Sequence, residues 1–262
     1  MGYGICNLSV IPVRSEPSEK SEMVSQVLFG ELLEIIQMTN NWCKVRLIYD
    51  NYEGWVDIKQ IIPLSEESYS KINDFPQSLT LDLVQILVDD TRNGMFPVVL
   101  GSCLPNLVNN TFYIDQNKYT YEGQVTDTGA ENSKENIIEN AYMYLNTPYL
   151  WGGRSPFGID CSGFTQMVYK LNGIKLLRDA KQQAKQGETL NLTSEAEPGD
   201  LAFFDKFDSE EENITHVGII LKNNKIIHAS GKVRIDTIDH QGIFNTIMNK
   251  YTHKLRIIKK II

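Results

Sequence analysis

The chain has 262 residues, of which 42% are hydrophobic and 22% charged, a balance typical of a soluble globular protein. The net charge of −8 is unevenly placed, because residues 1–127 contain 8 Lys and Arg against 17 Asp and Glu. Nucleic-acid binding depends on clustered basic side chains, and a membrane helix needs about 20 apolar residues in a row. We therefore expect neither a nucleic-acid partner nor a membrane span.

The first residues, MGYGICNLSVIPVRSEP, lack the basic start and apolar core of a secretory signal. This predicts a cytoplasmic protein, although a chain that begins after a removed signal would look the same, so export stays open. Cys6, Cys43, Cys103 and Cys161 are scattered, with no CxxC pair. They indicate free thiols rather than a zinc site, and no metal or organic cofactor is expected.

Residues 1–64 consist of short strand-like runs separated by turn-rich stretches such as SEPSEKSE, TNN and YDNYEG. The order of features, V-x-S-x-P-S, VSQVLFGE, N-W-x-K-V and GWV, resembles the bacterial SH3-like domain, a small β-barrel. Residues 65–127 again suggest short strands, and we expect a second, degenerate barrel of the same class. The small polar stretch DTGAENS, residues 127–133, is the predicted linker.

From residue 134 the pattern changes to a helical period and then to further strands. Apolar residues of KENIIENAYMYLNT share one helical face, and CSGFTQMVYKLNG and RDAKQQAKQG predict two more helices. Strands are predicted in GDLAFFD, THVGIILKN, KIIHASG, VRIDTI and KLRIIKKII. Helices followed by an antiparallel sheet predict an α+β domain over residues 128–262.

The strongest local signal for chemistry is PYLWGGRSPFGIDCSGFTQMVYKL, residues 148–171, in which Cys161 lies between a glycine-rich loop and a helix. The unpaired N–H groups and positive dipole of a helix start favour a thiolate, which is the attacking form of cysteine. A buried, inert cysteine is the alternative. The polar and small neighbours Asp160, Ser162 and Gly163 favour a nucleophile instead.

A cysteine nucleophile needs a base, and the base needs a partner that orients it. His216 opens the strand HVGIIL, and His228 lies on the next strand, across an NNK hairpin signal. Antiparallel neighbours can bring two such side chains together on one face, where His228 would hold His216 in the useful tautomer. His240 and His253 have no comparable setting and are predicted to be ordinary structural or surface residues.

Four motifs, DCSGF, EPGDLAFF, HVGIIL and IIHAS, occur in this order over residues 131–262. Their sequence and order resemble the NlpC/P60 cysteine peptidase family. The resemblance implies a papain-like α+β catalytic domain that follows two small SH3-like β-barrels. Together with the SH3-like region it resembles the γ-D-glutamyl-L-diamino acid endopeptidases, which act on small peptidoglycan fragments with a free N-terminal L-alanine.

The resemblance implies that Cys161 is the nucleophile, His216 the base and His228 the third polar residue. Tyr149 would help to hold the oxyanion, with the backbone N–H of Ser162 as a second donor. Packing of the loop is the alternative role for Tyr149.

The resemblance also implies substrate contacts. Asp160 and Ser162 match positions that hold the substrate's amine, although Asp160 could also simply cap the helix. Arg178 and Asp179 match a substrate-side motif in which the guanidinium could pair with the α-carboxylate of D-glutamate. Ala180 departs from the serine common in relatives, which puts fine specificity in doubt.

In this subgroup the first barrel closes one side of the cleft, and Tyr52 and Glu22 are our candidates for contact with the substrate's amine. Both could equally be surface residues. Three other functions stay open: a wall-binding protein without activity, a thiol amidase or acyltransferase on the same scaffold, and a structural adaptor. The intact cysteine and histidine set disfavours the first and the third.

Overall fold

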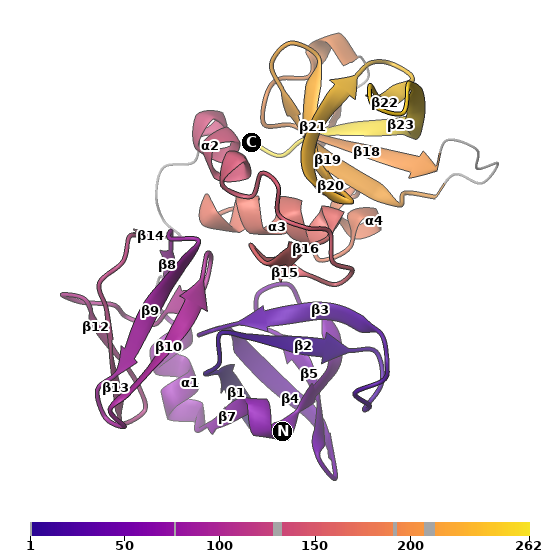
Figure 1. Cartoon of the computed structure of the whole chain (residues 1–262). Coiled ribbons are helices and arrows are strands. Elements are labelled where there is room, and N and C mark those ends of the chain that lie inside the picture. Colours follow the sequence, from indigo (N-terminus) through magenta and orange to yellow (C-terminus); the bar gives the residue numbers. More distant parts are fainter. Residues whose placement is uncertain (1, 76, 128–132, 191–192, 207–212) are drawn as a thin grey trace. The chain divides into compact units, whose positions relative to one another are not determined.

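The computed structural model describes residues 2–75, 77–127, 133–190, 193–206 and 213–262 (Figure 1). The chain divides into two compact units. Unit 1 comprises residues 1–130 and 151–156, and unit 2 comprises residues 131–150 and 157–262. The chain therefore leaves unit 2 for a short excursion into unit 1 and then returns. The predicted linker at 127–133 lies, apart from its two end residues, outside the described residues.

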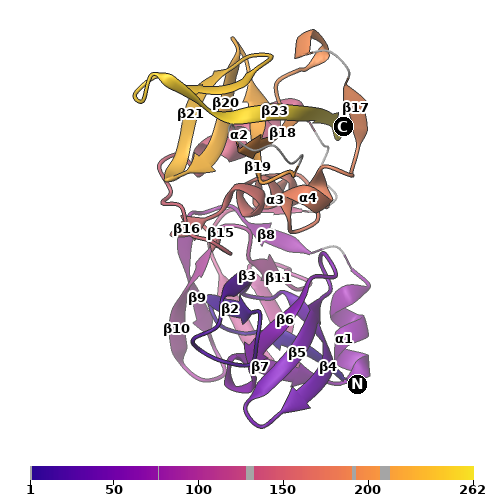
Figure 2. The ribbon, with the colours of Figure 1, turned by 90° about the vertical axis from the view of Figure 1, so that its right-hand side faces the viewer.

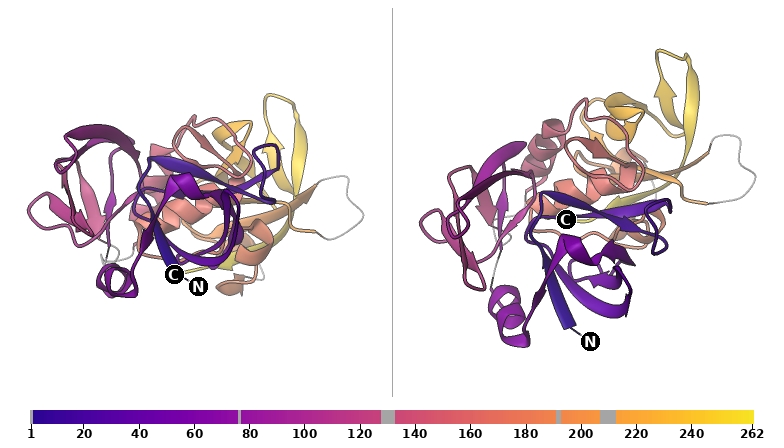
Figure 3. Two further views of the ribbon diagram at one scale, coloured as in Figure 1. Left: turned by 90° about the horizontal axis from the view of Figure 1, so that it is seen from below. Right: turned by 60° about the horizontal axis from the view of Figure 1, so that its bottom comes forward.

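Unit 1 begins with a curved antiparallel sheet of seven strands, whose curvature is visible in Figure 3. In the order of hydrogen-bonded neighbours these strands are β3 (Met23–Leu28), β2 (Val10–Arg14), β6 (Glu53–Asp57), β5 (Trp42–Leu47), β4 (Leu32–Thr39), β1 (Gly2–Cys6) and β7 (Ile61–Leu64). A short 3-10 helix, Ile58–Gln60, precedes β7. Along β5, Cys43, Val45 and Leu47 are buried while the residues between them are partly exposed. This one-sided core is the packing expected of the predicted small barrel.

The remainder of unit 1 consists of helix α1 (Glu66–Asn73) and two smaller antiparallel sheets. One sheet contains β10 (Gly94–Val99), β9 (Val84–Asp89), β13 (Asn117–Tyr121) and β12 (Thr111–Ile114), and the other contains β11 (Cys103–Leu104), β8 (Ser78–Thr80) and β14 (Val125–Asp127). Phe29, which follows β3, packs among Phe112 and Tyr119 of these strands. The β content agrees with the sequence, whereas a second SH3-like barrel stays a prediction.

A buried arginine holds residues 151–156 in unit 1. Arg154, which lies in β15 (Arg154–Ser155), is fully buried, and its Nη1 and Nη2 donate to the two carboxylate oxygens of Glu31 at 2.8 and 2.9 Å. Its Nη1 also donates to the carbonyl oxygen of Gln26 at 2.7 Å, and its backbone N–H donates to the Gln26 side chain at 2.7 Å. The charge is therefore buried only together with its partners, as burial of an ion requires.

Unit 2 combines helices with an antiparallel sheet of seven strands. Its helices are α2 (Lys134–Met143), α3 (Cys161–Leu171), α4 (Ala180–Gln183) and a 3-10 turn, Thr193–Glu195. Its sheet strands, in neighbour order, are β17 (Glu188–Leu190), β23 (Lys250–Lys260), β18 (Leu201–Lys206), β19 (His216–Leu221), β20 (Lys225–Ser230), β21 (Lys232–Ile238) and β22 (Gly242–Asn245). The short strand β16 (Gly158–Ile159) precedes α3.

Strand β22 also pairs with β23, so six strands of unit 2 close into a ring with β17 attached outside it. Helix α3 packs against β19 and β20, and Figure 2 shows it lying alongside the sheet. The succession of helices and then antiparallel strands confirms the predicted α+β class. The closure of the sheet and the short strands β17 and β22 were not predicted. In the described ranges, no helix is long and apolar enough to cross a membrane.

Candidate active site

Helix α3 carries Cys161 at its first position. Asp160 caps the helix, because one of its carboxylate oxygens accepts the backbone N–H of Gly163 at 2.6 Å. All residues of α3 are buried, and Cys161 is 7% exposed. Its sulfur lies 4.0 Å from the carbonyl oxygen of Thr215, the residue directly before β19. The start of α3 therefore places the thiol beside the N-terminal end of β19, which begins at His216.

The two predicted histidines meet on one face of the sheet. His228 in β20 is the register partner of Gly218 in β19, so it projects on the same side as His216. A Cβ at Gly218 would lie only 2.8 Å from the Cβ of His228, which explains the glycine of HVGIIL. His216 Nε2 and His228 Nδ1 are 2.8 Å apart. The hydrogen bond predicted between the two histidines is therefore present.

A carboxylate continues this chain of hydrogen bonds. His228 Nε2 lies 3.1 Å from Oδ2 of Asp236 in β21, and Arg234 Nη2 donates to Oδ1 of Asp236 at 2.9 Å. Neither Asp236 nor Arg234 is among the residues predicted from the sequence. A signal was available, since the alternation in VRIDTI places both on one face of the strand that pairs with IIHAS. Arg234 lies directly opposite His228.

The hydrogen bonds determine where the ring protons lie. An ionised Asp236 can only accept, so His228 Nε2 must donate to it. Neutral His228 then has an acceptor at Nδ1, and His216 Nε2 must be the donor between the two rings. His216 Nδ1 is consequently the unprotonated nitrogen, the atom that can take a proton from a thiol.

Burial keeps both imidazoles neutral. Burial, with His228 and His253 as neighbouring groups, lowers the pKa of His216 well below its ordinary value. Burial also lowers the pKa of His228, although its hydrogen bond to Asp236 opposes this. For Asp236, burial acts to raise the pKa, but hydrogen bonds from His228 and Arg234 overcome it and hold the pKa below its usual value. Asp236 is therefore the charged member of the chain.

The surroundings of Cys161 oppose the expected thiolate. Burial, reinforced by the Asp160 carboxylate, raises the pKa of Cys161 to about 12. Backbone N–H groups of Val217 and Ser162 act in the opposite direction but do not offset burial. Burial thus opposes the predicted helix-stabilised thiolate, because the sequence reveals the helix start but not the loss of water around it. The ionised state of Cys161 stays a prediction.

A buried arginine anchors the start of α3. Arg178 is 1% exposed, and it donates from Nη1 and Nη2 to the two carboxylate oxygens of Asp160 at 3.0 and 2.6 Å. Its Nη1 also donates to Ser162 Oγ at 3.0 Å. The structure thus brings three predicted residues together beside Cys161, with Arg178 directed at Asp160 and Ser162. Contact of any of them with substrate stays a prediction.

Tyr149 and Asp179 lie on either side of this group in the sequence. Burial, reinforced by the neighbouring Cys161 and Asp160, raises the pKa of Tyr149, so its hydroxyl is protonated at neutral pH and able to donate. This state is the one that the predicted oxyanion role requires. Asp179 precedes α4, where its backbone N–H donates to the side chain of Gln182 at 3.0 Å in a capping box.

The remaining two predicted residues, Tyr52 and Glu22, belong to unit 1. Tyr52 packs against the core of the first sheet. The Glu22 carboxylate accepts a hydrogen bond from Trp151 Nε1 at 2.6 Å, within the same unit. Their contact with a substrate amine stays a prediction.

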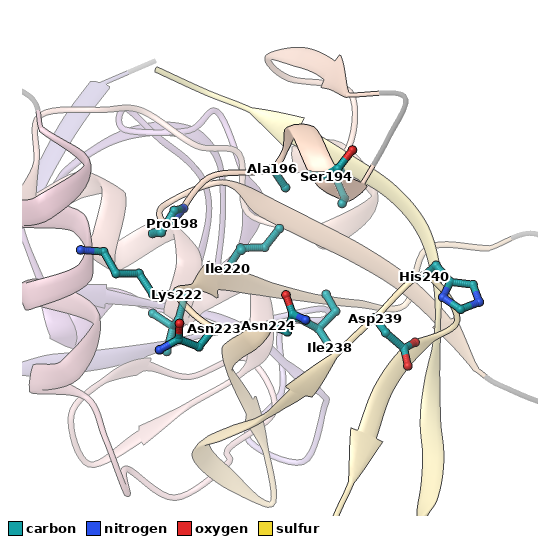
Figure 4. Close-up of a pocket in the computed structure, with 12 residues that line it drawn as sticks. Ser194, Ala196, Pro198, Ile220, Lys222, Asn223, Asn224, Ile238, Asp239 and His240 are labelled. Atoms are coloured by element: carbon teal, nitrogen blue, oxygen red, sulfur yellow. The ribbon is translucent and has the colours of Figure 1, made fainter.

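Unit 2 also contains a groove of about 610 Å³, shown in Figure 4. Its lining includes the apolar side chains of Ile220, Ile238 and Ile258, with Lys222 and Asn224 among the polar residues. Of the described residues that line it, none belongs to the predicted catalytic or substrate-binding set. Within the described ranges, no group of three His, Cys, Asp or Glu side chains is arranged to hold a metal ion.

A thiol at a helix start, with a histidine pair and a carboxylate on the adjoining sheet, defines the class of site: that of a papain-like thiol hydrolase. Two family comparisons specify it further. Residues 146–254 match the NlpC/P60 family, and residues 13–61 match the bacterial dipeptidyl-peptidase SH3 domain. The chain is a cysteine peptidase with an NlpC/P60 catalytic domain and an N-terminal SH3-like domain.

Similar proteins extend over most of the chain. It is 27% identical to dipeptidyl-peptidase 6 of Lysinibacillus sphaericus, covering 87% of this chain and 88% of that protein. It is 28% identical to gamma-D-glutamyl-L-lysine dipeptidyl-peptidase of Bacillus subtilis, covering 78% and 71%. Its fold is similar to that of an NlpC/P60 family protein from Bacillus cereus, with a TM-score of 0.84, 21% identity and 99% of both chains covered. Together, the family matches and the curated relatives support a peptidoglycan peptidase.

Proposed function

We propose that this protein hydrolyses the γ-D-glutamyl-L-diamino acid bond of peptidoglycan fragments with a free N-terminal L-alanine, in the recycling or turnover of cell-wall peptides. The observation that carries the proposal is the hydrogen-bonded chain His216–His228–Asp236 at the strand end where Cys161 lies. The choice of bond is supported by the names of two relatives, both called gamma-D-glutamyl-L-lysine dipeptidyl-peptidase.

In the acylation half of the reaction, the sulfur of Cys161 attacks the γ-glutamyl carbonyl carbon while its proton passes to Nδ1 of His216. A carbon–sulfur bond forms, and the carbonyl oxygen gains the negative charge. The backbone N–H of Ser162 and the hydroxyl of Tyr149 are the proposed donors to this oxygen. One such donor contributes about 3 kcal/mol to lowering the barrier.

The tetrahedral intermediate collapses when His216 gives its proton to the amine of the diamino acid, which leaves. A water molecule then transfers a proton to His216 and attacks the thioester, which releases L-Ala-γ-D-Glu and restores the thiol. His228 and Asp236 keep His216 in the required tautomer and stabilise its charged form during both steps.

Substrate recognition is proposed to rest on two groups of contacts. Asp160 and Ser162 would receive the free amine, with Tyr52 and Glu22 of unit 1 as further candidates. Arg178 and Asp179 would form the region that faces the α-carboxylate of D-glutamate. Positioning the scissile carbonyl against a fixed sulfur can itself lower the barrier by several kcal/mol, up to about 11 in the best cases.

The test is incubation with L-Ala-γ-D-Glu-L-Lys and L-Ala-γ-D-Glu-meso-diaminopimelate, followed by mass analysis. The expected products are L-Ala-γ-D-Glu and the free diamino acid. Cys161→Ala should lower kcat by roughly 10⁴-fold or more, because the nucleophile is lost. Cys103→Ala, which removes another buried thiol, should stay active.

An N-acetylated copy of each substrate tests the amine contacts, and kcat/KM should fall sharply for it. Equal rates for the free and acetylated peptides would remove the proposed preference for a free N-terminus. Turnover of plain amides or acyl donors, with no preference for the γ-D-Glu linkage, would indicate a thiol amidase or acyltransferase instead. Retained turnover in Cys161→Ala would refute the nucleophile.

A further inference from the structure

A third histidine lies against the proposed base. His253 of β23 stacks on His216, with ring centroids 4.2 Å apart and an angle of 27° between the ring planes. His228, by contrast, meets His216 edge-on, at 5.0 Å and 85°. The ring of His216 is therefore held at its Nε2 edge by a hydrogen bond and on one face by a second aromatic ring.

His253 is itself held in place by the fold. Its Nδ1 forms a hydrogen bond with Thr252 Oγ1 at 2.9 Å, and the ring of Phe204 lies 6.3 Å away in an edge contact. The sequence predicted an ordinary role for His253, and the structure corrects this. Its strand reaches His216 only because β23 pairs with β18 across a register shift, which no local pattern reveals.

We propose that His253 is a positioning residue for His216, whose stacked ring keeps Nδ1 of the base in the plane needed to take the proton of Cys161. The inference rests on the proposed function, in which His216 is that base. One hydrogen bond at Nε2 leaves an imidazole able to tilt about that bond, and the stacked ring removes this freedom. Proton transfer depends steeply on such alignment.

Burial and the neighbouring His228 favour a neutral His253 ring. It is faced by His216 from β19, His228 from β20 and Asp236 from β21, and its register partner on β18 is Lys206. Burial, with the neighbouring His228, lowers the pKa of His253 to about 4, although Asp236 opposes this. Above about pH 5, His216 therefore gains its proton against an uncharged aromatic face, which attracts a cation.

The test compares His253→Phe, which keeps an uncharged stacked ring, with His253→Leu, which keeps only apolar bulk. In His253→Leu we expect kcat for the γ-D-glutamyl tripeptide to fall on the order of tenfold to a hundredfold, with KM nearly unchanged. His253→Phe should restore kcat to near the wild-type value. His240→Phe and His240→Leu are matched controls at an exposed histidine and should leave kcat unchanged.

The reactivity of Cys161 gives a second measurement that does not depend on the peptide substrate. The rate of iodoacetamide alkylation of Cys161 should be nearly equal in the wild type and His253→Phe and lower in His253→Leu, because a tilted His216 takes up the thiol proton less readily. Thr252→Val keeps the ring of His253 but removes its hydrogen bond, which His253→Phe also lacks, so its kcat should match that of His253→Phe. If His253→Leu does not fold, His253→Gln takes its place with the same expectation.

Wild-type kcat in the variants without a ring would overturn the proposal, and so would a phenylalanine variant as slow as the leucine variant. Failure of the proposed function would give a different result from failure of the positioning role: Cys161→Ala or His216→Ala would retain turnover. If both are inactive and His253→Leu matches the wild type, only the positioning role fails.

Discussion

Two buried arginines, one in each unit, form nearly the same ion pair in different surroundings. Arg154 pairs with Glu31 through both Nη atoms, and Arg178 pairs with Asp160 in the same way. Both guanidinium groups are almost completely buried. The first pair fastens residues 151–156 into unit 1, whereas the second lies at the helix start that carries Cys161. The same kind of ion pair therefore stabilises the fold in unit 1 and supports the candidate active site in unit 2. The residues around each pair determine its role.

Breaking the first pair should give the largest effect, and it should be on stability. Glu31→Gln leaves the buried charge of Arg154 without its counterion, which costs about 3–5 kcal/mol. Thermal or denaturant unfolding should report this loss, while kcat of the folded fraction changes little. Glu53→Gln, at the exposed pair with Arg46, is the matched control and should hardly shift the unfolding midpoint. An unchanged midpoint in Glu31→Gln would contradict the role of this ion pair in holding residues 151–156 in unit 1.

Breaking the second pair should act on activity as well as on stability. Asp160→Asn keeps a residue that caps helices well, but it leaves the buried charge of Arg178 without its counterion, so unfolding should again show a loss of about 3–5 kcal/mol. It also removes the carboxylate proposed to receive the substrate's amine. We expect kcat/KM to fall on the order of a hundredfold, because the substrate is misplaced against the sulfur. Asp57→Asn, the same exchange at the 3-10 helix cap in unit 1, should leave activity unchanged. Wild-type activity in Asp160→Asn would assign this pair to the scaffold as well.

The smallest effect concerns pH. His216 must be unprotonated to take the thiol proton, and its pKa is well below the ordinary value of 6.5. Above that lowered pKa the base is ready, so kcat/KM should change little between pH 7 and pH 6 and fall only as the pH drops further. A midpoint of the acid limb at or above pH 6.5 would contradict the burial of this histidine. The pH dependence of kcat/KM is the measurement.

The sequence predicted the parts of the site that depend on local pattern. Cys161 was recognisable at the junction of a glycine-rich loop and a helix, and His216 and His228 were placed together because one short hairpin separates their strands. The SH3-like first sheet and the α+β order of unit 2 were likewise predictable from the period of the apolar residues and from the turn residues. Local pattern could not reveal that burial raises the pKa of the Cys161 thiol.

Features that depend on long-range register were not predicted. Asp236 could have been predicted from the alternation of residues along the strand after His228. His253, by contrast, reaches the site only through the closure of the sheet and a register shift between β18 and β23. Arg154 stands inside the motif that carries the nucleophile, yet its side chain completes unit 1. Neighbouring residues of one sequence motif therefore belong to different compact units, and only the tertiary structure shows which residue belongs to which unit.

The central claim is that the thiol of Cys161 depends on the imidazole of His216 for its reactivity. The most direct measurement is the rate of iodoacetamide alkylation of Cys161 at pH 7, followed by mass analysis of the peptide that contains it. We expect His216→Ala to react on the order of tenfold more slowly than the wild type, because the proton acceptor is lost. Equal rates in the two folded proteins would contradict it.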